Sequence, residues 1–184
     1  MSDPQLLAMA AGGDQAAFQI LYERHRDPVY RFAWAMTRSQ ADAEEIVQDS
    51  FLTLLRKAPE FRPEAASLRS WLLGITRNLC CRRRGKAAAE SAGALEEASG
   101  DAGIEAALIR NQTAEAVRRA VATLPAPQRE AIVLFEFEEL SLAETAAALR
   151  IDPNAVKARL HRGRARLRSV LPRLAPQGRS ESYE

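Results

Sequence analysis

Apolar residues recur at helical spacing along most of this chain, and none of its segments shows the alternating pattern of a strand. Short polar side chains stand where the apolar stripes begin and can cap a helix, as Asp14, Ser39 and Ser67 do. The first helix is expected to begin at Pro4 with Asp3 as its cap. The pattern predicts an all-α protein with helices over about 4–12, 14–37, 39–57, 67–86, 104–124 and 127–138, the second of them broken or kinked at Pro28.

The segment 140–168 has the layout of a helix-turn-helix. Ser141 and Glu144 form the S-x-x-E capping box that opens a helix. After a short interruption, Asp152 can cap a second helix that has Pro153 at its first position, where the missing N–H costs nothing. A buried stripe is expected along this second helix at Val156, Leu160, Leu167 and Leu171.

The rest of the second helix is cationic. No acidic residue occurs from Pro153 to Ala175, and the polar positions hold Lys157, Arg159, His161, Arg162, Arg164, Arg166 and Arg168. A cationic helix held against a short capped helix is the geometry that enters a DNA major groove. The alternative is the solvated basic face of an ordinary helical hairpin, but such a face normally mixes both signs of charge.

Charge is unevenly distributed along the chain, although its net value over 184 residues is only +2. A first basic block consists of Arg77, Arg82, Arg83, Arg84 and Lys86, and the C-terminal helix is the second. Between them, residues 87–109 hold acidic residues but no Lys or Arg, and 87–103 has the Ala, Gly, Ser and acid composition of a linker. Two basic blocks separated in this way indicate two contact surfaces for a polyanion.

The two cysteines, Cys80 and Cys81, are adjacent, which argues against a disulfide framework and favours a reducing, cytoplasmic compartment. A redox-sensing pair is the alternative for these thiols. No apolar run approaches the ~20 residues that span a bilayer, and the N-terminus lacks the layout of a signal peptide. The protein is therefore expected to be soluble and intracellular.

An enzyme is the hypothesis from a different class of function. No phosphate-cradling glycine motif, nucleophile elbow or H-E-x-x-H sequence is present. His25 and His161 lie in different halves of the chain, and two cysteines cannot complete a four-ligand zinc site without distant help. We expect no catalytic residue, no metal site and no cofactor.

Two stretches resemble the domains of extracytoplasmic-function sigma factors, which are small specificity subunits of bacterial RNA polymerase. They are DAEEIVQDSFLTLLRKAPEFRPEAASLRSWLLGITRN and LPAPQREAIVLFEFEELSLAETAAAL, the latter continued by NAVKARLHRGRARLR. The resemblance covers about 14–86 and 104–171. It implies two small helical domains: a region 2-like domain over 1–86 and a region 4-like domain over 104–172, with an acidic linker over 87–103 and a disordered tail over 173–184.

Family resemblance also implies which surfaces bind partners. The segment 41–57 looks like the helix that docks on the clamp helices of the largest subunit of core RNA polymerase. Its expected core-binding residues are Glu45, Gln48, Asp49 and Leu52. The linker would thread toward the active-site channel, and the second domain would contact the flap of the second-largest subunit.

The segment 61–84 resembles the region that opens promoter DNA at the minus-ten element. There a base must be turned out of the stack and the single strand must be tracked by cations. Asn78 aligns with the family position that lines the flipped-base pocket, and an amide can both donate and accept. Trp71 falls on the apolar stripe and is expected in the core. The expected minus-ten residues are Arg62, Ser67, Arg77, Asn78, Arg82 and Arg83.

For the minus-thirty-five duplex, the resemblance places Lys157, Ala158, His161 and Arg162 on the major groove, where cations can donate to guanine. Arg159, Arg164 and Arg166 are expected on phosphate or the polymerase flap. The chain departs from the family at the turn, where Arg150 replaces a usual Gly, and at the helix start, where Asn154-Ala155 replaces Gly-Thr. Asn154 is expected to accommodate left-handed backbone there, and Ala155 lacks a hydroxyl for a phosphate contact.

The resemblance implies a sigma factor that guides polymerase and assists promoter melting. Its partners would be core RNA polymerase, promoter DNA in duplex and single-stranded form, and an anti-sigma factor, often membrane-anchored, in a stress or envelope response. A stand-alone helix-turn-helix regulator is the closer rival. Such regulators usually dimerise to read two half-sites, and this chain offers no obvious dimer helix.

Overall fold

The computed structural model describes residues 1–90 and 108–174, and within these ranges all regular structure is helical, as the sequence predicts. The N-terminal elements are α1 (Asp3–Ala11), α2 (Gln15–Thr37), α3 (Gln40–Arg56), the 3-10 turn η1 (Ala58–Glu60) and α4 (Leu68–Glu90). The C-terminal elements are α5 (Leu108–Ala122), α6 (Ala126–Ile132), the π-helical turn η2 (Val133–Phe137), α7 (Leu142–Leu149) and α8 (Pro153–Leu174).

Local capping starts most helices where the sequence predicts. The Asp14 carboxylate accepts the Ala17 N–H at 3.0 Å to open α2, and the Ser67 hydroxyl accepts the Ser70 N–H at 3.2 Å to open α4. At the start of α3, Ser39 accepts a backbone N–H in the same way. Such bonds satisfy donors that a helix N-terminus otherwise leaves without a partner.

The first helix begins one residue earlier than expected, because Ser2 rather than Asp3 is its cap. Ser2 forms a capping box with Gln5, whose side chain accepts the Ser2 N–H at 3.0 Å. The Asp3 carboxylate is instead held by α2, where Arg24 lies 2.9 Å and His25 2.8 Å from its oxygens. Asp3 thus fastens α1 to α2 and is not available as a cap.

The expected break at Pro28 is wrong, because α2 is continuous from Gln15 to Thr37. A proline inside a helix costs about 3 kcal/mol through the lost hydrogen bond and the ring's clash with the preceding turn. Residues on both sides of it are buried, among them Leu21 before Pro28 and Val29 and Phe32 after it. Burial of the two flanking stripes offsets the local cost.

The C-terminal helices pack closely around α6. A Cβ added at Gly163 of α8 would lie 2.9 Å from Cγ1 of Ile132, the last residue of α6, so only glycine allows this approach. The expected stripe of α8 holds in part: Val156 and Leu160 are buried, whereas Leu167 and Leu171 are half-buried. The helix expected over 127–138 is α6 followed by the π-helical turn.

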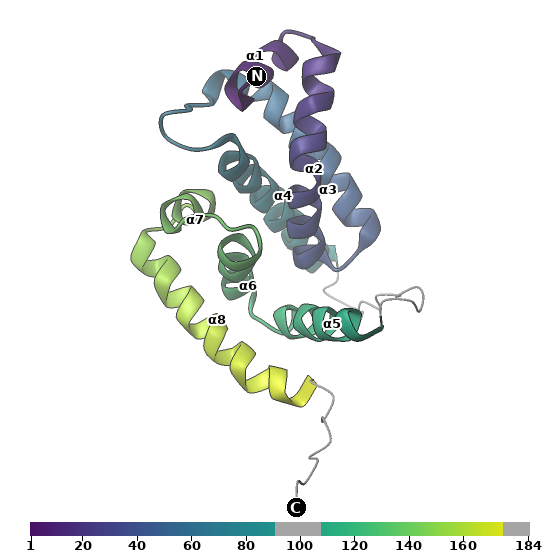
Figure 1. Ribbon diagram of the computed structural model, residues 1–184, viewed down its shortest axis with the longest axis vertical. Coiled ribbons are helices and arrows are strands. Elements are labelled where there is room, and N and C mark those ends of the chain that lie inside the picture. The colour runs from purple at the N-terminus through teal and green to yellow at the C-terminus, as the bar shows by residue number, and fades with distance from the viewer. Residues whose placement is uncertain (91–107, 175–184) are drawn as a thin grey trace, which may run out of the picture.

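The two groups of helices lie side by side and share a hydrophobic core. Figure 1 shows α1–α4 together in one half, with α6 and α7 facing α2 and α4 and with α8 on the outside. The shared core joins residues of the N-terminal half, such as Phe32 and Leu73, to Leu134 and Leu149 of the C-terminal half. We call these halves the N-terminal and C-terminal domains.

Two helices extend past the residues at which the sequence pattern was expected to end. Helix α4 continues past Lys86 to Glu90, which covers 87–90 of the expected linker with helical backbone, as its run of alanines favours. Helix α8 ends at Leu174, beyond the expected boundary at 172. The rest of the linker, over 91–103, and the tail over 175–184 lie outside the described residues.

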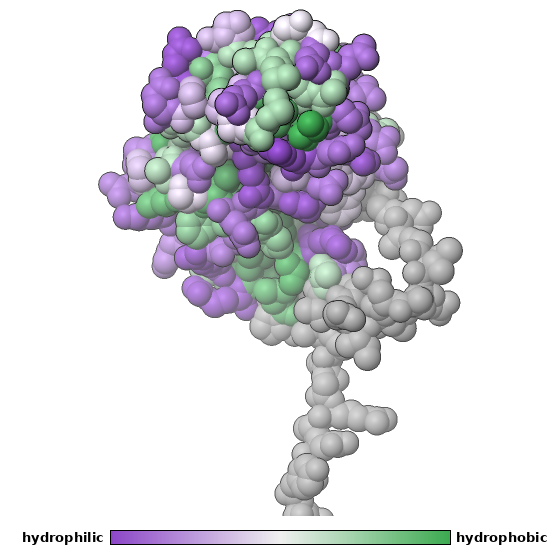
Figure 2. Space-filling view, turned by 45° about the horizontal axis from the view of Figure 1, so that its top comes forward, coloured by the Kyte–Doolittle hydropathy of each residue, from purple (hydrophilic) through white to green (hydrophobic). Residues whose placement is uncertain are grey.

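Most of the face shown in Figure 2 is hydrophilic, with hydrophobic residues in smaller areas between the polar ones. Among the described residues, the large hydrophobic side chains most exposed to solvent are Met1, Met9, Ile20, Leu52 and Phe137. Within that same part of the chain, no helix is long and apolar enough to cross a bilayer, and no cluster of three or more His, Cys, Asp and Glu side chains could hold a metal ion.

Candidate nucleic-acid interface

Helices α7 and α8 form the helix-turn-helix that the sequence predicts. Ser141 and Glu144 make both bonds of the capping box: the Ser141 hydroxyl accepts the Glu144 N–H at 3.2 Å, and the Glu144 carboxylate accepts the Ser141 N–H at 3.0 Å. Asp152 caps α8 by accepting the N–H groups of Asn154 at 2.9 Å and Ala155 at 3.0 Å. Pro153 is the first residue of α8. These bonds set the residue at which each helix begins.

The left-handed residue of this turn is Arg150, with φ 55° and ψ 46° at the C-cap of α7. The expectation that Asn154 would supply left-handed backbone is wrong, because Asn154 belongs to α8. A left-handed arginine costs about 1 kcal/mol or more relative to glycine. Backbone bonds from Arg150 N–H to Ala147 and from Ile151 N–H to Ala146 hold it there, at 3.2 and 3.1 Å.

Four of the six minus-thirty-five candidates on α8 are exposed: Lys157, His161, Arg162 and Arg164. Ala158 is half-buried. Arg164 donates to Glu136 at 2.7 Å, so it is partly neutralised within its own domain. Arg159 is turned toward α6 of its own domain, with its guanidinium 4.0 Å from the buried Glu130. The exposed set agrees with a helix that offers cations to duplex DNA.

A groove of about 330 Å³ runs beside this exposed face. Its apolar floor comes from Phe135, Leu142 and Leu160, and cationic or polar side chains of α8 form its rim. The guanidinium of Arg164 also lies over the Phe135 ring, 5.7 Å from its centroid, which is a cation–π distance. The C-terminal domain therefore combines an exposed cationic helix with an adjacent apolar groove.

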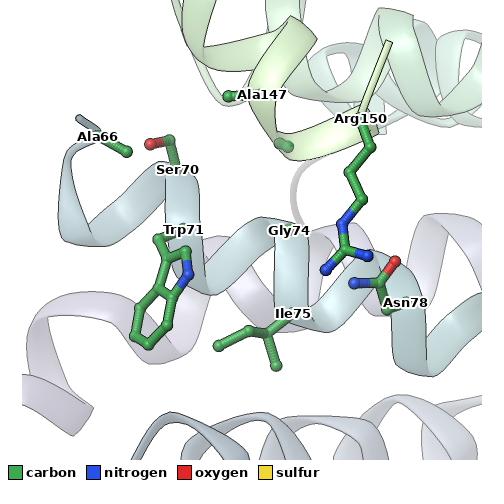
Figure 3. A pocket seen from close by; sticks show the side chains of 9 residues that line it. Ala66, Ser70, Trp71, Gly74, Ile75, Asn78, Ala147 and Arg150 are labelled. Carbon is green, nitrogen blue, oxygen red and sulfur yellow. The ribbon is translucent and has the colours of Figure 1, made fainter. Parts of the chain in front are cut away.

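On α4, the candidate base-binding residue Asn78 is half-buried where α4 meets the C-terminal domain. A pocket of about 80 Å³ lies between the two domains, lined on α4 by Trp71, Gly74 and Asn78 and on the other side by Ala148 and Arg150. Figure 3 shows Arg150 reaching from the end of α7 toward Asn78. Trp71 is half-buried and stacks against Phe61 with ring centroids 5.1 Å apart, in keeping with a place at the edge of the core.

The other minus-ten candidates divide into exposed and engaged residues. Arg62 and Arg82 are exposed. Ser67 donates to Glu144 at 2.6 Å, and Arg77 lies 3.2 Å from a Glu130 oxygen, so both contact the C-terminal domain. Arg83 pairs with Asp42 and Glu45 of α3. The structure thus does not gather these candidates on one face, because Ser67 and Arg77 contact acids of the C-terminal domain whereas Arg83 contacts acids of α3.

The core-binding candidates share the outer face of α3. Glu45, Gln48, Asp49 and Leu52 are all exposed, and their spacing of three and four residues puts them on one stripe. The side chain of Leu52 is apolar yet 57% exposed. An exposed leucine amid polar residues suits a contact with another protein.

Two glutamates that the sequence did not single out are central to the arrangement. Glu130 is 2% exposed and Glu138 is 0% exposed, and both are surrounded by arginines of the N-terminal domain. A glutamate in an amphipathic helix normally faces water. One sequence feature could have predicted these buried acids: α4 has an excess of cations, and cations packed inside a fold need anionic partners.

Hydrogen bonding across this contact shifts two ionisable groups. The bond from Ser67, aided by the Ser141 N–H, holds the pKa of Glu144 below its usual range. Hydrogen bonding to Glu138 raises the pKa of Arg31. Both shifts favour the charged forms of Glu144 and Arg31.

The cysteines form no disulfide. Burial raises the pKa of Cys80 to about 12, which keeps this thiol protonated and unreactive. Cys81 is half-buried beside α6, with its Sγ 3.6 Å from Glu130 and 3.2 Å from Arg84. Both thiols therefore belong to the packing of α4 against its neighbours.

Comparisons with known proteins agree with this arrangement. The family model for Sigma-70 region 2 matches residues 21–90, and that for Sigma-70, region 4 matches residues 114–167. The ECF RNA polymerase sigma factor SigM of Mycobacterium tuberculosis is 38% identical over 170 residues, which are 92% of this chain and 85% of the relative.

Two solved structures share the fold over most of the chain. One is CnrH, a sigma factor of Cupriavidus metallidurans, in complex with the cytosolic domain of CnrY, with a TM-score of 0.69 and 28% identity over 94% of this chain and 99% of that one. The other is the sigma factor RpoE of Bartonella quintana in complex with the anti-sigma factor NepR, with a TM-score of 0.70 and 27% identity over 84% and 96%. The chain therefore belongs to the extracytoplasmic-function family of RNA polymerase sigma factors.

Proposed function

We propose that this protein binds core RNA polymerase, directs it to specific promoters and helps to melt them. The observation that carries the proposal is the pairing of two basic helices, α8 in a helix-turn-helix and α4 in the N-terminal domain. One suits duplex DNA and the other suits an opened strand. The polymerase carries out the phosphoryl-transfer chemistry, and the sigma factor positions the polymerase on the promoter.

Four contacts, two with promoter DNA and two with core polymerase, would serve this function. The exposed face of α8 contacts the minus-thirty-five duplex through Lys157, His161 and Arg162. The side of α4 that carries Asn78 holds the opened minus-ten strand. The outer face of α3 docks on the clamp helices of the largest polymerase subunit, and the C-terminal domain engages the flap of the second-largest. The exposure of α3 and α8 supports these assignments.

Control by an anti-sigma factor in the cytoplasm completes the proposal. Both solved relatives were captured with partner proteins, one of which is named as an anti-sigma factor. A partner of this kind would act on the surfaces described above. The family relationship supports its existence, and its identity and trigger depend on the organism's own genes.

Replacing Arg162 with Ala is expected to change promoter preference, whereas Arg166→Ala should weaken binding on all promoters alike. Arg162 is placed on base edges, where one good contact is worth about 1–3 kcal/mol of discrimination. Arg166 is placed on phosphate, so its loss should also reduce the slope of log affinity against log salt by about 1. Polymerase loaded with each variant is compared on promoters altered at the minus-thirty-five element.

Both arginines are exposed on the same helix, so each variant serves as the other's control for charge loss and folding. Identical profiles across the promoter set would refute the division between base and phosphate contacts.

A further inference from the structure

The guanidinium group of Arg83 on α4 is held by two acids of α3. Its Nη2 atom pairs with the Asp42 carboxylate, and its Nη1 atom lies 2.8 Å from a Glu45 oxygen. Two separate carboxylates therefore engage the two terminal nitrogens of one arginine. The sequence placed Arg83 on the opened strand, but in the structure its charge is directed at α3, the proposed polymerase-docking helix.

Helical spacing places Arg83 on the face of α4 that packs against α3. Thr76 precedes Arg83 by seven residues and so lies on the same side of α4. The hydroxyl of Thr76 lies 3.0 Å from that of Ser50 on α3, and both residues are fully buried. The two helices thus meet at two polar contacts, one in the buried middle of α3 and one near its start, where Arg83 pairs with its acids.

The face of α4 that carries Asn78 points in a different direction. At about 100° per residue, Asn78 lies about 140° around the helix from Arg83 but only about 40° from Arg82. Arg82 is exposed and makes no ion pair with any other residue in the described part of the chain. The cation that extends the Asn78 face toward a DNA strand is therefore Arg82, and Arg83 points away from that face.

Glu45 is one of the four residues that we place on core polymerase, and Arg83 restricts the movement of its carboxylate. An unrestrained glutamate on a protein surface loses side-chain freedom when a partner binds, which costs binding free energy. The side chain of Glu45 is 55% exposed, so it can meet a partner while it remains paired with Arg83. The ion pair thus orders a docking side chain before polymerase binds.

We propose that Arg83 is a positioning residue for polymerase docking, which fixes Glu45 and the start of α3 from α4, and that it does not contact the promoter strand. The inference rests on the proposed functions of α3 in docking and of α4 in strand binding. It divides two adjacent arginines of the basic block by helix face: Arg82 serves the DNA strand, and Arg83 serves the docking surface.

Arg83→Gln in the full-length protein tests this division. Titration of labelled core polymerase should show binding about threefold to fivefold weaker than wild type, the effect expected of a partly exposed ion pair. Polymerase saturated with the variant is then titrated with a fluorescein-labelled promoter fragment whose minus-ten segment is single-stranded. The slope of log affinity against log salt should equal the wild-type slope, because no phosphate contact is lost.

Arg82→Gln is the matched variant with the opposite expected effect, since it removes the same charge from the neighbouring residue. It should reduce the magnitude of that slope by about 0.7, the contribution of one phosphate contact in single-stranded DNA. Its affinity for core polymerase should equal that of wild type, because Arg82 makes no contact with α3.

Two further variants show whether Arg83 acts through Glu45 and guard against a general loss of structure. Glu45→Gln should weaken core binding by itself, and Arg83→Gln should add little in that background, because both changes break the same contact. A general loosening of the fold would instead lower affinity equally in both backgrounds. Arg83→Lys keeps the charge but replaces the two-nitrogen fork with one ammonium group, so core affinity should fall here too.

The outcomes separate the inference from the functions on which it rests. A slope reduced by about 0.7 in Arg83→Gln would place Arg83 on the strand and overturn the inference. Wild-type core affinity of this variant, or an effect that adds fully to that of Glu45→Gln, would overturn it as well. If Glu45→Gln alone binds core polymerase as wild type does, the docking role of Glu45 is refuted and the positioning role of Arg83 falls with it. An unchanged slope in Arg82→Gln refutes only the strand contact of Arg82.

Discussion

The substitution Leu52→Arg is expected to lower affinity for core RNA polymerase by about 30-fold or more while leaving the fold intact. Leu52 is 57% exposed on the outer face of α3, so its loss removes little buried area from the protein itself. A desolvated apolar residue at the centre of an interface is commonly worth about 2 kcal/mol or more. Burying an arginine there adds the cost of an unpaired charge. Titration of labelled core polymerase with the variant measures the loss.

Met9→Arg is the control, because Met9 is another exposed large hydrophobic residue, 40% exposed, but lies on α1 and not on α3. It should bind core polymerase as wild type does. Thermal unfolding of both variants should match wild type within about 0.5 kcal/mol, as for most surface substitutions. Equal binding by the Leu52 variant and its control would remove α3 as the docking surface.

Gly163→Leu is expected to destabilise the C-terminal domain by about 3 kcal/mol and to abolish recognition of the minus-thirty-five duplex. Even the first side-chain atom would come 2.9 Å from Cγ1 of Ile132, which is buried and has no room to withdraw. Helix α8 must therefore shift away from α6, and its cationic face shifts with it. Urea unfolding and binding to duplex promoter by loaded polymerase measure the two effects.

Gly85→Leu makes the same substitution on α4 at a glycine that is not closely packed, and the opposite effect on stability is expected. No atom lies within 4 Å of a Cβ added at Gly85, and leucine favours helix more than glycine does, so stability should rise by up to about 1 kcal/mol. Equal effects at the two glycines would show that close packing of α8 on α6 does not determine the position of the recognition helix.

Local chemistry is what the sequence predicted best. The caps Ser141 and Asp152 accept hydrogen bonds from N–H groups only two or three residues away, so the local sequence is enough to predict them. The same holds for the exposure of α3 and α8, which follows from helical periodicity. Two local predictions were wrong because contacts with other helices override them. Packing in the core keeps Pro28 inside a continuous helix, and the ion pairs of Asp3 with α2 prevent it from capping α1.

Contacts between segments that are distant along the chain could not be predicted from the sequence. Glu138 meets Arg31 across 107 positions, and Glu130 meets Arg77 across 53. The residues around Glu130 and Glu138 have the apolar and polar pattern of an ordinary amphipathic helix. This pattern gives no sign that the two glutamates are buried. For the same reason α4 was expected to present Asn78 and Arg77 to DNA, and the structure instead shows them facing the second domain.

Transcription by core RNA polymerase, with and without this protein, on a library of DNA fragments tests whether the protein directs polymerase to promoters. Sequencing of the RNA should show that the protein makes core polymerase start at a discrete set of promoters with shared minus-thirty-five and minus-ten elements. The protein alone should bind the same duplexes only weakly. Tight, dimeric and operator-specific binding without polymerase, together with no added initiation, would contradict the account and identify a stand-alone regulator instead.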